Sequence, residues 1–162
     1  IVPAKWFYLI VKDVMIKEEE KFFREVYKDL DKKLPAINKI INFEIAKFEY
    51  VAETSKMYIM TPNLYIEFKT KLFEYIKQIR LKELEILDKI IIDGVKNNEL
   101  INCDTKKVAN LILTISEALR HREFYYATFS ITKEINFDKE VEEMKFAVKL
   151  IFEGLKNNNT EV

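Results

Sequence analysis

The sequence predicts an all-helical protein, and two observations carry this prediction. Only two glycines occur in 162 residues, so the chain has little material for hairpin turns or phosphate-binding loops, which rely on positive φ angles. In five stretches the apolar residues recur at spacings of three and four, the period of amphipathic helices. The length suits one domain with a proper hydrophobic core.

Prolines and polar residues predict where the first helices begin and end. A helix is expected from about Lys17 to Leu34, because Pro35 disfavours the helical conformation at the residue before it. Pro35 then suits the first turn of a second helix that runs to about residues 55–60. Thr61 and Pro62 signal a short third helix.

The second half of the chain continues this pattern. The short helix is expected to bend into a long one that ends at Asn97 and Asn98. Asp104 and Asp138 are each placed to cap a following helix, which brings the total to about six. Residues 158–162 are expected to form a frayed tail.

The inventory of reactive residues argues against an enzyme. One cysteine excludes a disulfide framework and multi-cysteine metal sites, and one histidine excludes His-rich zinc and paired Glu-x-x-His iron sites. Cys103 precedes a helix N-terminus that could lower its pKa, but a lone loop cysteine is more often inert. Gly94 and Gly154 are isolated, so no phosphate-binding loop is present. We expect no catalytic residues, metal or cofactor.

Charge and hydropathy predict the environment of the protein. The 27 basic and 27 acidic side chains balance, whereas a nucleic-acid-binding domain normally has an excess of basic residues. The apolar stretch over residues 1–16 contains Lys5, Lys12 and Asp13 and is too short to cross a bilayer. We therefore expect a soluble cytoplasmic protein with no membrane partner.

The last two helices are apolar over more than one face. Residues 111–115 and 148–152 are nearly continuous apolar runs. Such a wide apolar arc indicates either contact with a second subunit or a central position in the chain's own fold. The pattern alone leaves both interpretations open.

Glu117 and His121 are one helical turn apart, so a carboxylate could orient the imidazole toward a cavity. An exposed or capping histidine is the simpler interpretation. Tyrosines such as Tyr58, Tyr65 and Tyr75 could line a ligand pocket or simply fill the core.

Four segments in the expected order resemble the effector domain of the TetR family of bacterial transcriptional repressors. The isoleucine-rich stretch with a glycine, the polar turn and the following helix start lie at residues 90–113. The closing acidic-Gly-Leu run lies at 153–155, the linker-like helix starts at 17–26, and the helix break lies at 61–64. The resemblance covers most of residues 17–156.

The resemblance implies an effector-binding and dimerisation domain over residues 17–157. A small, partly apolar effector would occupy a cavity between the helices of residues 36–95 and the start of the helix at 105, and would tilt the helix of residues 17–34. The implied ligand-binding residues are Phe48, Val51, Tyr58, Tyr65, Phe68, Phe73, Ile76, Arg80, Leu111, Thr114, Glu117 and His121.

The resemblance also implies a homodimer, in which the last two helices of each subunit form a four-helix bundle. The implied interface residues are Ile112, Ile115, Leu119, Val141, Met144, Val148, Ile151, Phe152 and Leu155. Operator DNA would be bound through an N-terminal helix-turn-helix that this chain lacks, with residues 1–16 as its remnant or connection. A helical interaction and dimerisation module without a ligand is the alternative.

Overall fold

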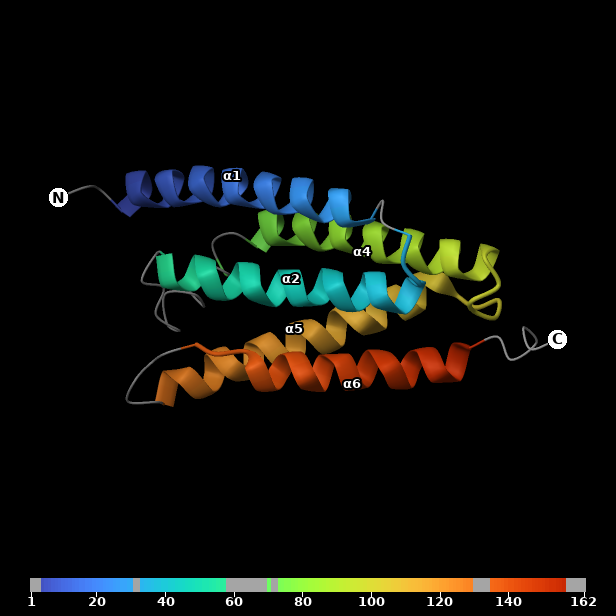
Figure 1. The fold of residues 1–162 in the computed structure, drawn as a ribbon. Coiled ribbons are helices and arrows are strands. Elements are labelled where there is room, and N and C mark those ends of the chain that lie inside the picture. The colour runs from blue at the N-terminus through green and yellow to red at the C-terminus, as the bar shows by residue number, and fades with distance from the viewer. Residues whose placement is uncertain (1–3, 31–32, 58–69, 71–72, 130–134, 157–162) are drawn as a thin grey trace. The chain divides into compact units, whose positions relative to one another are not determined.

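A computed structural model describes residues 4–30, 33–57, 70, 73–129 and 135–156. These residues form five α-helices, in agreement with the predicted all-α class (Figure 1). The helices are α1 (Ala4–Leu30), α2 (Ala36–Met57), α4 (Phe73–Lys96), α5 (Thr105–Phe129) and α6 (Asp138–Leu155). The short helix expected at Thr61 lies outside the described residues. None of the five helices is both long enough and apolar enough to cross a bilayer.

The chain divides into two compact units, residues 1–33 and 34–162. The first unit contains α1, which begins at Ala4 and not near Lys17 as expected. The prediction was wrong because it required regular apolar spacing, whereas residues 4–30 contain no proline or glycine that would break a helix. Residues 4–16, which make up most of the segment interpreted as a remnant or connection, therefore form the first half of α1.

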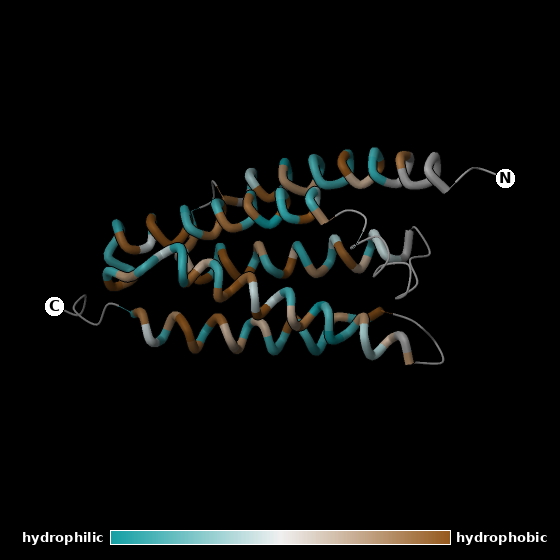
Figure 2. The backbone as a smooth tube through the Cα atoms, turned by 180° about the vertical axis from the view of Figure 1, so that it is seen from behind, coloured by the Kyte–Doolittle hydropathy of each residue, from teal (hydrophilic) through white to brown (hydrophobic). Residues whose placement is uncertain are grey.

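The second unit packs four helices around one core. In this unit α2 contacts α4 and α6, and α5 contacts α4 and α6. The Ile101 N–H donates to the Leu155 carbonyl at 2.9 Å, which places the start of α5 near the end of α6, so these two helices run antiparallel. Brown apolar and teal polar segments alternate along the helices, as expected for amphipathic helices with one buried face (Figure 2).

One short loop, which follows α4, caps both the C-terminus of α4 and the N-terminus of α2. Asn98 has a positive φ of 59°, a common ending for helices, and the N–H groups of Glu99 and Leu100 donate to the Gly94 carbonyl at 2.9 and 3.2 Å. The Glu99 carboxylate then accepts a 2.7 Å hydrogen bond from the Ala36 N–H. The predicted end at Asn97 and Asn98 is confirmed, and the cap on α2 comes from a residue distant in sequence.

The two predicted aspartate caps have different outcomes. Asp104 caps α5, because its Oδ1 accepts a 3.1 Å hydrogen bond from the Lys107 N–H, which lowers the pKa of Asp104. The prediction for Asp138 is wrong: Asp138 is the first residue of α6, and its own N–H donates to Asn136 Oδ1 at 2.8 Å. Asn136 thus satisfies an N–H at the start of α6.

The two glycines lie in opposite surroundings, which makes them a matched pair of test sites. A Cβ at Gly94 would lie 2.9 Å from both Ala36 Cβ and Leu100 Cδ1, whereas a Cβ at Gly154 would have no atom within 4 Å. We expect Gly94→Ala to lower the free energy of unfolding by about 1–3 kcal/mol through overpacking. Gly154→Ala should raise it by up to about 1 kcal/mol through helix propensity. Urea titration of both variants measures this, and equal effects would contradict the close contact at Gly94.

Candidate functional site

Charged side chains lie inside the second unit, where α2 and α5 meet. Glu44 of α2 is fully buried, and Arg120 of α5 is 6% exposed. Arg120 Nη1 lies 3.8 Å from Glu44 Oε2, close enough for an ion pair but too far for a hydrogen bond. The Arg120 guanidinium also lies over the Phe48 ring, 5.1 Å from its centroid.

Several polar atoms in this region have no hydrogen-bond partner among the described residues. They are both carboxylate oxygens of Glu44, the Ser116 hydroxyl and Arg120 Nη1. We call Glu44, Ser116 and Arg120 the core polar cluster. Buried polar groups in proteins nearly always have hydrogen-bond partners. The cluster therefore has unused hydrogen-bonding capacity.

Burial raises the pKa of Glu44, because removal from water penalises the charged carboxylate. The Arg120 charge opposes this shift most strongly. The Ser116 hydroxyl opposes it as well, although its geometry falls short of a full hydrogen bond. Lys47 also lowers the pKa and Glu117 raises it, but burial outweighs the combined effect of its neighbours.

Two more ion pairs connect the same helices. Lys47 of α2 pairs with the buried Glu83 of α4. Arg80 of α4 donates from Nε to both carboxylate oxygens of Glu117 in α5, at 3.1 and 3.2 Å. Together with Glu44 and Arg120, these pairs join α2 to α4, α4 to α5 and α2 to α5.

Three of the predicted ligand-binding residues meet at the α4–α5 contact. Arg80 Nη2 donates to Asn110 Oδ1 at 3.0 Å and to the Thr114 hydroxyl at 3.3 Å, while its Nε bonds to Glu117. Asn110 was not predicted. The Arg80 guanidinium therefore bonds to three residues of one neighbouring helix, and this arrangement holds the two helices together.

The other predicted ligand-binding residues are scattered. Phe48 is a core residue, and Val51 and Ile76 are half-buried. The side chains of Phe73, Leu111 and His121 are exposed. Tyr58, Tyr65 and Phe68 lie outside the described residues.

Many of the predicted interface residues lie in the core of the single chain. Ile112, Met144, Val148 and Phe152 are buried there. The others are half-buried: Ile115, Leu119, Val141, Ile151 and Leu155. The core accounts for part of the wide apolar arc of each helix, so a partner subunit would have to contact neighbouring residues. The interface itself stays a prediction.

A different set of apolar side chains is exposed on α5 and α6. The Arg122 guanidinium bonds to Glu140 at 2.8 Å and to Glu143 at 2.7 Å, which shows which flank of α5 faces α6. Helical spacing places the exposed apolar residues of both helices beside this contact. We call one part of this surface the outer face: the exposed Leu111 and Ala118 and the half-buried Ile115 of α5, and the exposed Phe146, Leu150 and Gly154 of α6.

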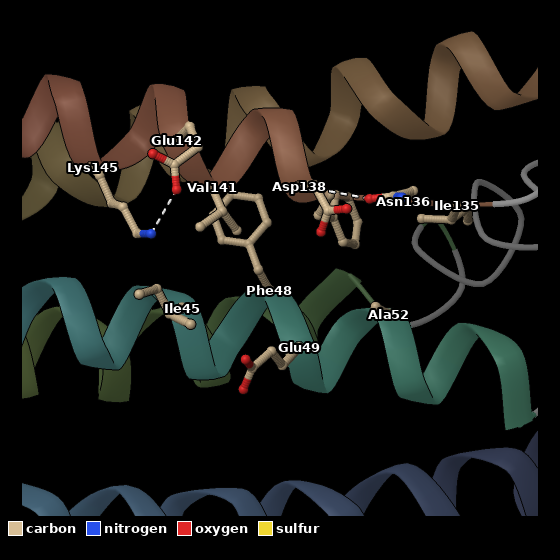
Figure 3. Close-up of a pocket in the computed structure, with 11 residues that line it drawn as sticks. Ile45, Phe48, Glu49, Ala52, Ile135, Asn136, Asp138, Val141, Glu142 and Lys145 are labelled. Atoms are coloured by element: carbon tan, nitrogen blue, oxygen red, sulfur yellow. Dashed lines mark hydrogen bonds and ion pairs between the residues drawn. The ribbon is translucent and has the colours of Figure 1, made fainter.

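A groove of about 670 Å³ lies between α2, α6 and the segment that leads into α6. Its residues include Ile45, Phe48 and Ala52 from α2 and Val141 from α6 (Figure 3). Of the predicted ligand-binding residues in the described part of the chain, only Phe48 lines this groove.

Nothing in the described residues suggests metal or thiol chemistry. No group of three or more His, Cys, Asp or Glu side chains in this part of the chain is arranged to hold a metal ion. Burial and the neighbouring Asp104 carboxylate raise the pKa of the Cys103 thiol, which opposes the lowering that a helix N-terminus could give.

The core polar cluster was missed by the sequence analysis, although the pattern contains a signal. Glu44 lies midway between Ile40 and Phe48 at four-residue spacing, within the apolar stripe of its helix. Ser116 and Arg120 likewise continue the line from Ile112. A charged residue in line with core residues indicates a buried charge and not a solvated face.

Comparisons with known protein families, characterised proteins and solved structures give no match for this chain.

The raised pKa of Glu44 predicts how stability depends on pH. The native state holds this proton more tightly than the unfolded state, so the contribution of Glu44 is complete below its ordinary pKa of 4.5 and is lost as pH rises through the native pKa. Glu44→Gln cannot ionise. The unfolding free energy of the wild type should therefore fall relative to this variant, by up to about 1.4 kcal/mol per pH unit between the two pKa values.

Urea titrations from pH 4 to pH 8 measure this difference. Glu85→Gln, an exposed site on α4, gives the trend for a surface carboxylate, and only the excess over it belongs to Glu44. A wild type that gains stability over Glu44→Gln as pH rises would show that the attraction of Arg120 outweighs the cost of burial.

Proposed function

We propose that this chain is the ligand-sensing and dimerisation part of a TetR-like transcriptional regulator. The core polar cluster is the observation that carries this proposal. Glu44, Ser116 and Arg120 offer unused hydrogen-bonding atoms between α2 and α5. The sequence resemblance implies an effector bound among these same helices.

The chemistry of the cluster describes the effector. Arg120 Nη1 can donate a hydrogen bond, Glu44 can accept one, and the Ser116 hydroxyl can do either. The neighbouring buried side chains Phe48 and Ile112 are apolar. A small molecule with one polar end that both donates and accepts, and with an apolar body, matches this environment.

The outer face supports dimerisation. Phe146 is 64% exposed and Leu150 is 58% exposed, and they adjoin the exposed apolar residues of α5. A second copy on this face would bring α5 and α6 of both subunits together as a four-helix bundle. Ile115 belongs both to this face and to the interface predicted from the sequence.

Regulation would follow from coupling between the effector and the DNA. An effector changes DNA affinity only if it binds the DNA-competent and DNA-incompetent arrangements with different affinity. In this proposal the DNA is bound by a helix-turn-helix encoded before Ile1. A reading frame without such a motif would overturn the DNA-binding part of the proposal.

A second function is an interaction and dimerisation module without a ligand. The full burial of Phe48, Leu87 and Ile112 favours it, because these side chains fill space that an effector would need. This module would use the same outer face.

Retention of a small molecule distinguishes the two functions. We expect native mass spectrometry of the purified protein to show a bound molecule, which Ser116→Ala loses at least tenfold more readily. Ser55→Ala is the control, because the Ser55 hydroxyl is also buried but donates to the Val51 carbonyl at 2.7 Å. Absence of any bound molecule from both the wild type and the control would favour the module without a ligand.

A charge on the outer face should separate the dimer. Leu150→Glu would place an unpaired carboxylate in the interface, and we expect the dissociation constant to rise on the order of 100-fold. Leu81→Glu is the control, because Leu81 is also an exposed leucine but lies on α4, which contributes no residue to the outer face. Light scattering at micromolar concentration measures the mass. A wild-type monomer, or a dimeric Leu150→Glu variant, would contradict the assigned interface.

A further inference from the structure

The groove between α2 and α6 has two matching walls. On α2 it is lined by residues 45, 48, 49 and 52, and on α6 by residues 138, 141, 142 and 145. Each set follows the spacing i, i+3, i+4, i+7, which defines a single helix face. The two helices therefore present one face each to the same space, and residues 135–137 close one end (Figure 3).

The charges along these walls are unbalanced. Three carboxylates, those of Glu49, Asp138 and Glu142, line the groove with a single amine, that of Lys145. Lys145 Nζ already pairs with Glu142 Oε1 at 2.7 Å. This leaves Glu49 and Asp138, one on each wall, and within the described part of the chain neither carboxylate has an ion-pair partner.

Apolar side chains form the inner surface of the groove. Phe48 and Phe137 contact each other edge to face with ring centroids 5.3 Å apart, and Phe137 also packs against Phe124 at 6.0 Å. Ile45, Ala52 and Val141 are half-buried and contribute apolar surface closer to the opening. Glu49 and Asp138 are both exposed, so the groove combines solvent-exposed negative charge with an apolar inner surface.

We propose that this groove binds a small organic cation with an apolar body. The volume of about 670 Å³ lies within the range of small-molecule sites. The ligand's charge would lie beside the Asp138 carboxylate, with Glu49 adding negative charge on the α2 wall, and its apolar part would pack against Ile45, Ala52 and Val141. The site does not depend on DNA binding or on a second subunit, because α2, α6 and residues 135–137 provide the whole groove.

Two ions of the same shape and opposite charge test the site. Tetraphenylphosphonium carries a positive charge and tetraphenylborate a negative one on nearly the same apolar body. We expect calorimetry to detect binding of the cation but not of the anion. The cation should bind at least tenfold more weakly to the double variant Glu49→Gln and Asp138→Asn. Equal binding of both ions would show non-specific hydrophobic adsorption and overturn the proposal.

Further variants locate the binding. Glu85→Gln removes an exposed carboxylate of α4 and should leave the affinity unchanged. Ala52→Trp fills the groove without altering its charges and should abolish binding, with circular dichroism confirming the helical fold. Unchanged binding to Ala52→Trp or to the double variant would overturn the proposal. So would binding of a lysine-rich peptide in place of tetraphenylphosphonium, which would assign the groove to a polypeptide partner.

Discussion

The arrangement of the second unit depends on a buried ion pair that is not fully satisfied. Glu44 and Arg120 are both removed from water, yet they lie 3.8 Å apart without a hydrogen bond. A pair of this kind recovers only part of its desolvation cost, so it is weak evidence for stability. Sliding α5 along α2 would separate Glu44 from Arg120 and leave two unpaired charges inside the core, which disfavours a shifted register. Apolar side chains alone impose no comparable penalty on a shifted register.

Phe48 connects this ion pair to the surface. The Arg120 guanidinium lies over its ring, and the ring also packs edge to face with Phe137, which lines the groove. The residue therefore belongs both to the core polar cluster and to the groove between α2 and α6. Because protein interiors are close-packed, a ring that moves on one side must be accommodated on the other. The two candidate binding regions thus share a single side chain.

The sequence was informative about helices and less so about their contacts. The end of α4 at Asn98 and the cap at Asp104 follow from local chemistry, which a single chain reveals. The start of α1 and the role of Asp138 were missed, because neighbouring residues allow more than one boundary. Arg80, Thr114 and Glu117 were predicted to bind a ligand, and the structure brings them together as a contact between α4 and α5. The pattern of each helix indicates that Glu44 and Arg120 are buried, but their meeting depends on which helix faces pack together, and the pattern of one helix does not contain that information.

The segment between α4 and α5 secures three helices at once. Its N–H groups bond to the Gly94 carbonyl near the end of α4, its Glu99 side chain bonds to the first turn of α2 across 63 residues, and its Ile101 N–H bonds to the last turn of α6. During folding, the Ala36 N–H of α2 therefore lacks its partner until Glu99, 63 residues later in the chain, has reached its position. Cutting or lengthening these few residues would release three helix ends together, so this short connection holds one end each of α2, α4 and α6 in place.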